Sequence, residues 1–195
     1  MNTNSRMNRL LLCLVAVILI VPATVALTRS KPQAASGPSG KLIAVHGDVS
    51  LNGTSAISGA TVFSDSTVTT AKGSSAVVSL GKLGRVEVLP ETTMTLTFTD
   101  SSVAVSMLSS GRVRLSSPPG TATTATTGDG QVLAADDGEQ MFTVDTTCGN
   151  TFVSVKVGRV ELRAGSTVKQ IAAGGQDTAG TATPGCTNST GPGRN

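Results

Sequence analysis

The sequence predicts an all-β protein in which many short antiparallel strands form a sandwich, a roll or an irregular solenoid-like stack, with one apolar helix at the N-terminus. Valine and threonine, which favour strands, are frequent, and runs rich in Ala, Leu, Glu and Lys that would indicate soluble helices are absent. Apolar residues alternate with polar or small ones in segment after segment. Glycine, of which there are 22, combines with Asn, Asp and Pro at roughly 8–12-residue spacing, as turns between short strands do.

The first element is a membrane-targeting segment over residues 1–27. Two arginines precede an apolar run, residues 10–27, which is the pattern of a secretory signal. As a helix this run would be about 27 Å long, close to the roughly 30 Å hydrocarbon core of a bilayer, so an uncleaved membrane anchor is equally compatible. Thr24-Val25-Ala26 would suit a signal peptidase, whereas the basic residues just after it disfavour cleavage. Either alternative places the body of the protein in the cell envelope, periplasmic or otherwise extracytoplasmic, anchored or secreted.

Two segments of simple composition flank the expected domain. Residues 28–40 are rich in Pro, Ser, Gly and Ala and predict a flexible linker. Residues 177–195 are rich in Thr, Gly and Pro and predict a tail that is poorly ordered unless something ties it down. The β domain is therefore expected over residues 41–176.

Within that domain, strands with one buried face are predicted where apolar residues recur at every second position. The clearest such segments are Val86-Glu-Val-Leu, Val103-Ala-Val, Val113-Arg-Leu, Val153-Ser-Val-Lys-Val and Val160-Glu-Leu-Arg. A Gly-Arg-Val motif recurs at Gly84, Gly111 and Gly158, with a close variant at Gly47. In each copy Gly would make a turn, the charged residue would face water and Val would begin the inward row. The motif indicates similar β-coils or hairpins stacked along one core.

The order of these elements carries a family resemblance. A threonine, a glycine-serine pair, a small-apolar strand, a glycine-x-valine strand and a proline-x-threonine step follow one another. They read Val68-Thr-Thr-Ala-Lys-Gly-Ser-Ser-Ala-Val-Val-Ser-Leu80 and Gly84-Arg-Val-Glu-Val-Leu-Pro-Glu-Thr92, then Gly111-Arg-Val-Arg-Leu115 and Gly158-Arg-Val-Glu-Leu162. In this order residues 41–176 resemble the FecR-type periplasmic domain. One departure is Gly138-Glu-Gln-Met-Phe142, which replaces the family's Gly-Thr-x-Phe step.

The resemblance implies a periplasmic or surface β domain without catalytic residues. Full-length members relay signals through a cytoplasmic sigma-factor-regulating segment, a transmembrane helix and a receptor-contacting part. Here about nine residues precede the apolar run, too few for such a regulating segment. We therefore expect the shared domain without its signalling parts.

No catalytic, cofactor-binding or metal site is expected. His46 is the only histidine and sits in an apparent first strand, where a solvent-facing residue is far commoner than a catalytic base. Too few His and Cys are present for a closed zinc site. The acidic cluster Asp136-Asp137-Gly138-Glu139 is expected to be a hairpin turn rather than a calcium loop. Lys72-Gly-Ser-Ser and Gly128-Asp-Gly are expected to be β-turns, because neither opens the helix that a phosphate loop needs.

The composition also argues against sugars and nucleic acids as partners. The chain has no Trp, no Tyr and only four Phe, so it lacks the aromatic faces on which sugars and single-stranded nucleic acids stack. The basic residues of its net charge of +3 are concentrated around the N-terminal run and form no clustered basic face. Nucleic acid is therefore not an expected partner.

Two cysteines remain beyond the targeting segment, Cys148 and Cys186. In an oxidising compartment, and in turn-like surroundings, they are expected to form a disulfide that pins part of the tail to the last hairpin. Two free thiols, or thiols paired between molecules, are the alternative.

The leading functional hypothesis is a non-enzymatic envelope module that binds an envelope protein or a cell-wall polymer, with a possible sensory role. It would also contact the membrane through residues 10–27 if these are not cleaved. Alternatives are a structural or adhesive surface protein and a sigma-factor-linked transducer without its cytoplasmic part. A hydrolase with an unrecognised site would require a cluster of perturbed acids in a cleft.

Overall fold

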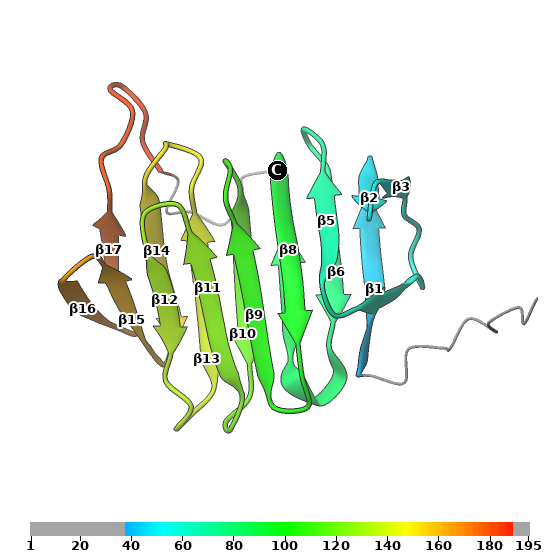
Figure 1. The fold of residues 1–195 in the computed structure, drawn as a ribbon, viewed down its shortest axis with the longest axis horizontal. Helices are drawn as coiled ribbons and strands as arrows, with labels where there is room; N and C mark the ends of the chain where they lie inside the picture. Colours follow the sequence, from blue (N-terminus) through cyan, green and yellow to red (C-terminus); the bar gives the residue numbers. More distant parts are fainter. Residues whose placement is uncertain (1–37, 189–195) are drawn as a thin grey trace, which may run out of the picture. The chain divides into compact units, whose positions relative to one another are not determined.

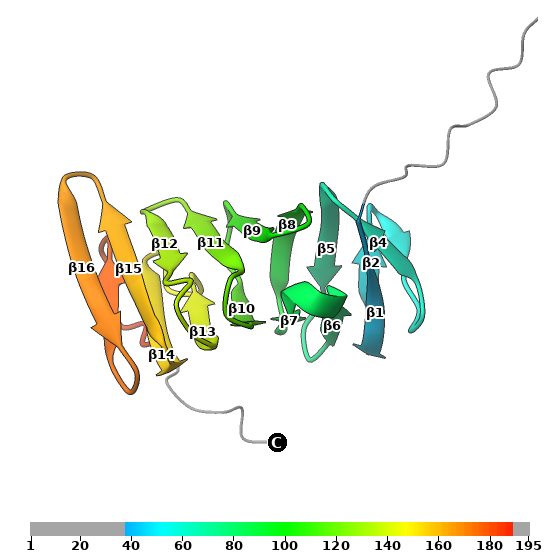
Figure 2. The same cartoon turned by 90° about the horizontal axis from the view of Figure 1, so that it is seen from below.

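The computed structural model describes residues 38–188, which form two β-sheets facing each other around one apolar core (Figures 1 and 2). Sheet A has eight strands in the order β17 (Gln176–Ala179), β14 (Thr151–Val157), β13 (Gln140–Asp145), β10 (Arg112–Ser117), β7 (Arg85–Val88), β6 (Ser75–Ser79), β1 (Ser39–His46) and β4 (Thr61–Phe63). Sheet B has nine strands in the order β16 (Thr167–Ala172), β15 (Arg159–Ala164), β12 (Gln131–Ala134), β11 (Ala122–Thr127), β9 (Ser102–Met107), β8 (Thr92–Phe98), β5 (Ser66–Thr70), β2 (Val49–Leu51) and β3 (Thr54–Ser55). A 3-10 turn, η1 (Gly81–Leu83), links β6 to β7.

The all-β prediction is confirmed for this part of the chain. The predicted targeting segment 1–27, with its apolar helix, lies outside the described residues, as does most of the predicted linker. Across residues 38–188, helices of the length and apolarity needed to cross a bilayer are not found.

The chain builds the sandwich by moving back and forth between the two sheets. The hairpin β6–β7 lies in sheet A, β8–β9 in sheet B, β11–β12 in sheet B, β13–β14 in sheet A and β15–β16 in sheet B. Between them β10 crosses alone into sheet A, so that β9 and β11 become parallel neighbours in sheet B. Every other strand pair is antiparallel. The architecture is therefore a sandwich assembled from stacked hairpins and single strands; of the four motif copies only Gly84 lies in a hairpin, and the other three lie where the chain crosses between the sheets.

Apolar side chains at every second strand position fill the space between the sheets. In β8, Met94, Leu96 and Phe98 are buried while the residues between them face outward. The first valine of each motif copy starts an inward row, and all four valines are buried: Val49, Val86, Val113 and Val160. Because the core contains few aromatic residues, its volume comes from Val, Leu and Met, with Phe98 and Phe142 as the largest members.

The glycine of the motif has a structural reason that the sequence did not show. In three of the four copies, the backbone N–H after the glycine donates to a buried side-chain oxygen: Asp48 N to Ser74 Oγ at 2.9 Å, Arg112 N to Thr92 Oγ1 at 2.8 Å, and Arg159 N to Gln140 Oε1 at 2.8 Å. A Cβ on Gly158 would lie only 2.0 Å from that same Gln140 oxygen, so any larger residue there would push the acceptor away. The glycine thus leaves room for a buried side chain that accepts a hydrogen bond from the start of the following strand. We call this buried acceptor the clamp residue.

The strands extend slightly beyond the predicted limits of the domain. β1 begins at Ser39, and β17 ends at Ala179, so the first residues of the predicted tail belong to sheet A. Residues 180–188 continue as a loop, and the remaining tail lies outside the described residues.

Candidate interaction surface

The outer face of sheet B carries an array of threonine side chains. In β8 the sequence Thr93-Met-Thr-Leu-Thr97 alternates, so that burial of Met94 and Leu96 turns the three threonines outward. β5 does the same with Thr67 and Thr69 on either side of the buried Val68. The hydrophobic pattern that fixes the core therefore also fixes this surface.

Strand register lines these side chains up in rows. Thr67 lies opposite Thr95, with their hydroxyl oxygens 3.4 Å apart, and Thr69 lies opposite Thr93 at 3.3 Å. The first row continues across β9 and β11 through Ser106 and Thr126. We call the set the hydroxyl face: Thr67, Thr69, Thr93, Thr95, Thr97, Ser106, Thr124 and Thr126.

The hydroxyl face is uncharged. From β5 to β11, the outward-facing residues of sheet B are threonine, serine and alanine, without a charged side chain. At its margin, Thr97 donates to the Asp65 carboxylate at 2.9 Å. A shallow depression of about 190 Å³ opens on this face, lined by Thr93, Met94, Thr95, Ser106, Leu108 and Ser109. Because hydroxyl groups both donate and accept, this face can form hydrogen bonds to polar partners of either kind.

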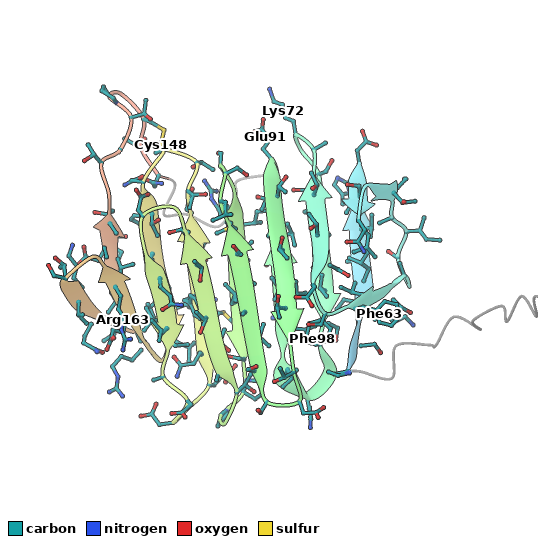
Figure 3. All side chains as sticks on the ribbon, viewed as in Figure 1. Phe63, Lys72, Glu91, Phe98, Cys148 and Arg163 are labelled. Atoms are coloured by element: carbon teal, nitrogen blue, oxygen red, sulfur yellow. A yellow bond between two sulfur atoms is a disulfide. The ribbon has the colours of Figure 1, made fainter. Side chains whose placement is uncertain are left out.

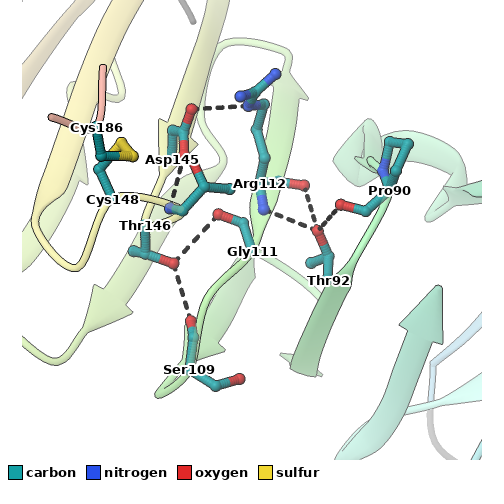
Figure 4. Close-up of polar contacts among 10 residues, drawn as sticks. Pro90, Thr92, Ser109, Gly111, Arg112, Asp145, Thr146, Cys148 and Cys186 are labelled. Atoms are coloured by element: carbon teal, nitrogen blue, oxygen red, sulfur yellow. Dashed lines mark hydrogen bonds and ion pairs between the residues drawn. A yellow bond between two sulfur atoms is a disulfide. The ribbon is translucent and has the colours of Figure 1, made fainter. Parts of the chain in front are cut away.

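The outer face of sheet A has a different chemistry, because charged pairs cross it. Arg114 Nη1 lies 2.7 Å from Glu87 Oε2, both about one-third exposed. Arg112 Nε donates to Asp145 Oδ2 at 2.8 Å, and the Asp145 side chain is fully buried (Figure 4). Asp145 also accepts from the backbone N–H and the hydroxyl of Thr147. These charges are paired within the domain, whereas the hydroxyl face carries no charge.

The predicted site residues do not converge. His46 is the last residue of β1 and is exposed, opposite Ser75 of β6. Lys72-Gly-Ser-Ser forms the turn from β5 to β6, and Gly128-Asp-Gly forms the hairpin turn between β11 and β12. Among residues 38–188, groups of three or more His, Cys, Asp or Glu side chains that could hold a metal ion are not found.

The acidic cluster is not the hairpin turn that the sequence predicted. Asp136-Asp137-Gly138-Glu139 joins β12 in sheet B to β13 in sheet A, so it is a crossing between sheets. Asp137 Oδ2 lies 3.2 Å from Arg159 Nη2, with both side chains mostly exposed. The cluster was misassigned because a turn between strands looks the same in sequence whether the strands pair or face each other.

The structure joins Cys148 and Cys186 by a disulfide, with their Cα atoms 5.6 Å apart (Figure 4). Cys148 lies in the turn between β13 and β14, so the bridge holds the loop after β17 against that hairpin rather than against the last hairpin, β15–β16. A backbone hydrogen bond from Thr183 N to Cys148 O at 2.8 Å adds a second tie. Cys148 is buried and Cys186 is exposed.

One carboxyl group has a perturbed pKa. The hydrogen bond from Lys169 Nζ, 2.6 Å from Asp177 Oδ1, lowers the pKa of Asp177, helped by the backbone N–H of Thr178 and opposed by partial burial. Lys169 lies on edge strand β16 and Asp177 on edge strand β17, so the pair spans the two sheets at one end of the sandwich. This is a structural contact, remote from the hydroxyl face.

Sequence reasoning did not single out the hydroxyl face. The signal was present in the Thr-x-Thr-x-Thr pattern of β8, but threonine is also an ordinary strand former. Only the register of β5, β8, β9 and β11 shows that these side chains share one surface.

Comparison with known proteins gives a limited result. The chain matches no protein-family profile. No curated protein matches it. Two crystal structures of a candidate anti-sigma factor from Parabacteroides distasonis ATCC 8503 are similar in fold, each with a TM-score of 0.49, at 19% and 18% sequence identity. Each match covers 60% of this chain and 59% of that chain, so less than two thirds of the other protein is spanned.

Proposed function

We propose that this protein is a non-enzymatic binding module of the cell envelope, a FecR-like β domain that recognises an envelope protein through the hydroxyl face of sheet B. The observation that carries the proposal is the continuous uncharged array of hydroxyl groups on β5, β8, β9 and β11. Elsewhere on the described sheets, several charged side chains are paired with one another.

The chemistry of this face favours a protein over a polysaccharide. Threonine and serine side chains lose little conformational freedom on contact, and they can bond to backbone amides and carbonyls of a partner. Carbohydrate sites usually include an aromatic platform, and this chain has no Trp and no Tyr. Leu108, at the depression, offers an apolar anchor beside the hydroxyl groups.

An extracytoplasmic location is part of the proposal. The basic and apolar pattern of residues 1–27 supports export. The Cys148–Cys186 disulfide supports an oxidising compartment, because such bonds are rare in the cytosol.

Site-specific photo-crosslinking of the full-length protein in its own envelope tests the proposal. A photoreactive residue replaces Thr95 on the hydroxyl face, and the matched control carries it at Thr143, a half-buried strand residue on the outer face of sheet A. We expect a discrete cross-linked protein from position 95 and none from position 143. The additional substitution Thr93→Lys should abolish the product by placing a charge in the face.

Two outcomes would count against the proposal. Equal products from both positions would mean that sheet B is not the recognition surface. Cross-links from position 95 only to cell-wall material would assign the surface to a wall polymer instead of a protein.

A further inference from the structure

The two ends of the sandwich differ in character, and this difference points to a second contact surface. At one end, edge strands β16 and β17 are joined by Lys169, which bonds to Asp177 Oδ1 and, at 3.0 Å, to Thr178 O. Charged side chains of this kind protect sheet edges from unwanted contacts. At the other end, edge strands β3 and β4 have no such ion pair among the described residues.

Exposed apolar side chains gather at that second end. Five large apolar side chains are exposed in residues 38–188, and three of them lie on β1, on β4 or on the connection between β3 and β4. They are Ile43 at 54% exposure, Ile57 at 74% and Phe63 at 47%. The other two, Leu108 and Val168, stand singly elsewhere. We call the three residues the apolar margin.

Backbone contacts place the apolar margin along one boundary of sheet A. Gly59 N donates to Leu42 O at 2.7 Å, and Ala60 N donates to Ile57 O at 3.1 Å, so Ile57 lies close to Leu42 and its neighbour Ile43. Phe63 pairs with Ser39 at the start of β1. Figure 3 shows Phe63 at this end of the sandwich and Arg163 at the opposite end.

Ile43 is exposed because it alternates with the buried Gly40 and Leu42 and therefore faces outward from sheet A. The register between β1 and β6 then shifts between Leu42 and Ala44, so the strand is irregular beside Ile43. Ile57 lies in a connection rather than in a strand. Neither residue is needed for the alternation that fills the core, and three large apolar residues kept outside it indicate a contact.

The charges around the margin suit a lipid surface. Lys41 is exposed, and it lies beside Gly59, whose Cβ position would be 4.0 Å from Lys41 Cε. The acidic residues nearby are Asp48 and Asp65, and Asp65 is engaged with Thr97. A basic residue such as Lys41 beside apolar ones favours the interface of a membrane with anionic lipids.

The length of chain between the apolar run and β1 limits how far β1 can lie from the bilayer. Eleven residues lie between Leu27, the last of the apolar run, and Ser39. They span about 40 Å when fully extended and about 20 Å as a flexible coil. If residues 10–27 stay in the bilayer, β1 is thus within reach of its surface.

We propose that the apolar margin rests on the extracytoplasmic surface of the lipid bilayer that holds residues 10–27, with Ile43, Ile57 and Phe63 inserted among the lipid headgroups. This contact leaves the hydroxyl face, on sheet B, for a partner. It fixes the orientation of the domain instead of leaving the domain to swing on its linker.

The absence of Trp and Tyr from the chain makes the test clean. The full-length protein is reconstituted in vesicles of phosphatidylcholine and phosphatidylglycerol as single-tryptophan variants. Phe63→Trp and Ile57→Trp report on the apolar margin, and Val168→Trp and Leu108→Trp are controls at exposed apolar positions elsewhere. Each variant is measured with and without bromine on the lipid acyl chains, since bromine quenches nearby tryptophan.

We expect blue-shifted emission and quenching by brominated lipid for the two margin variants only. Equal quenching of all four variants would overturn the proposal, because it would indicate adsorption without a preferred end. Red-shifted, unquenched emission from the margin variants would overturn it as well. So would a blue shift without quenching, which would mean that protein, such as a second copy, covers the margin. Ile57→Trp lies in a connection and keeps the test valid if Phe63→Trp disturbs β4.

Discussion

The side-chain oxygen of Gln140 and the backbone N–H of Arg159 form a 2.8 Å hydrogen bond that links β13 to the start of β15, and Gly158 makes this bond possible. Gln140 is almost fully buried, so its amide has little water to replace a lost partner.

Gly158→Ala should therefore lower the free energy of unfolding by about 2–4 kcal/mol, since a buried hydrogen bond is lost in addition to backbone strain. Gly174→Ala is a matched control, because Gly174 has nearly the same φ, +81° against +84°, but has nothing within 4 Å of its Cβ position. The control should cost about 1 kcal/mol. Urea unfolding measures both, and equal losses would mean that the close approach to Gln140 is unimportant.

Asp145→Ala should destabilise the domain by about 3 kcal/mol, because it removes the fully buried acceptor of Arg112 and Thr147. Glu87→Ala removes the partner of Arg114 from a pair that is about one-third exposed, so it should cost at most about 1 kcal/mol. Thermal or chemical unfolding of the two variants gives the comparison. A loss as small for Asp145→Ala as for Glu87→Ala would contradict the importance assigned to burial.

Reduction of the Cys148–Cys186 disulfide should lower the free energy of unfolding by about 4 kcal/mol in the chain-entropy view, given its separation of 38 residues. Unfolding curves with and without reductant measure this difference. The Cys148→Ser/Cys186→Ser variant is the control and should be insensitive to reductant. Non-reducing mass spectrometry of exported protein that finds two free thiols would refute the bridge.

The Lys169–Asp177 pair should make stability fall in acid. Because the pKa of Asp177 is lowered in the folded state, the unfolded chain binds the proton more readily. Its contribution is therefore complete above about pH 4, the ordinary range of an aspartate, and is lost as the pH falls through the lowered folded value. Both side chains are more than one-third exposed, so the effect should be small and should shrink with added salt.

The urea midpoint of Asp177→Asn, compared with that of the unchanged protein at pH 7 and at pH 3, measures this contribution. The variant should lie below the unchanged protein at pH 7 and approach it at pH 3. A difference that is the same at both pH values would show that the ion pair does not contribute.

Most of the core could be predicted from the sequence, because period-2 alternation decides which side chains point inward. Val86, Val113 and Val160 are buried as the Gly-Arg-Val motif indicated. The assignment of strands to sheets could not be predicted, since alternation is identical in both layers. That is why the segment Asp136–Glu139 was taken for a hairpin turn although it crosses between the sheets.

The two proposed surfaces could not be predicted from the sequence, for different reasons. An apolar residue in a strand, such as Ile43, is ordinarily a core residue, and in Leu42-Ile43 only the structure shows that Leu42 faces inward and Ile43 outward. In the sequence Thr95 looks like any strand residue. Its place in a row of hydroxyl groups follows only from its pairing with Thr67 and Ser106. Both surfaces depend on contacts between segments distant in the chain, which composition and periodicity do not report.

The alternation of hairpins between two layers also bears on how this architecture can change over time. Each unit rests mainly on the units before and after it, so its length is not set by closure of a ring or barrel. A duplicated pair of strands could enter the middle of the series and lengthen the stack by one step, provided that it carried its own glycine and clamp residue. Proteins of this type can therefore be expected to vary in the number of strand pairs in the stack, while the ion-paired strands at one end and the exposed apolar side chains at the other are kept.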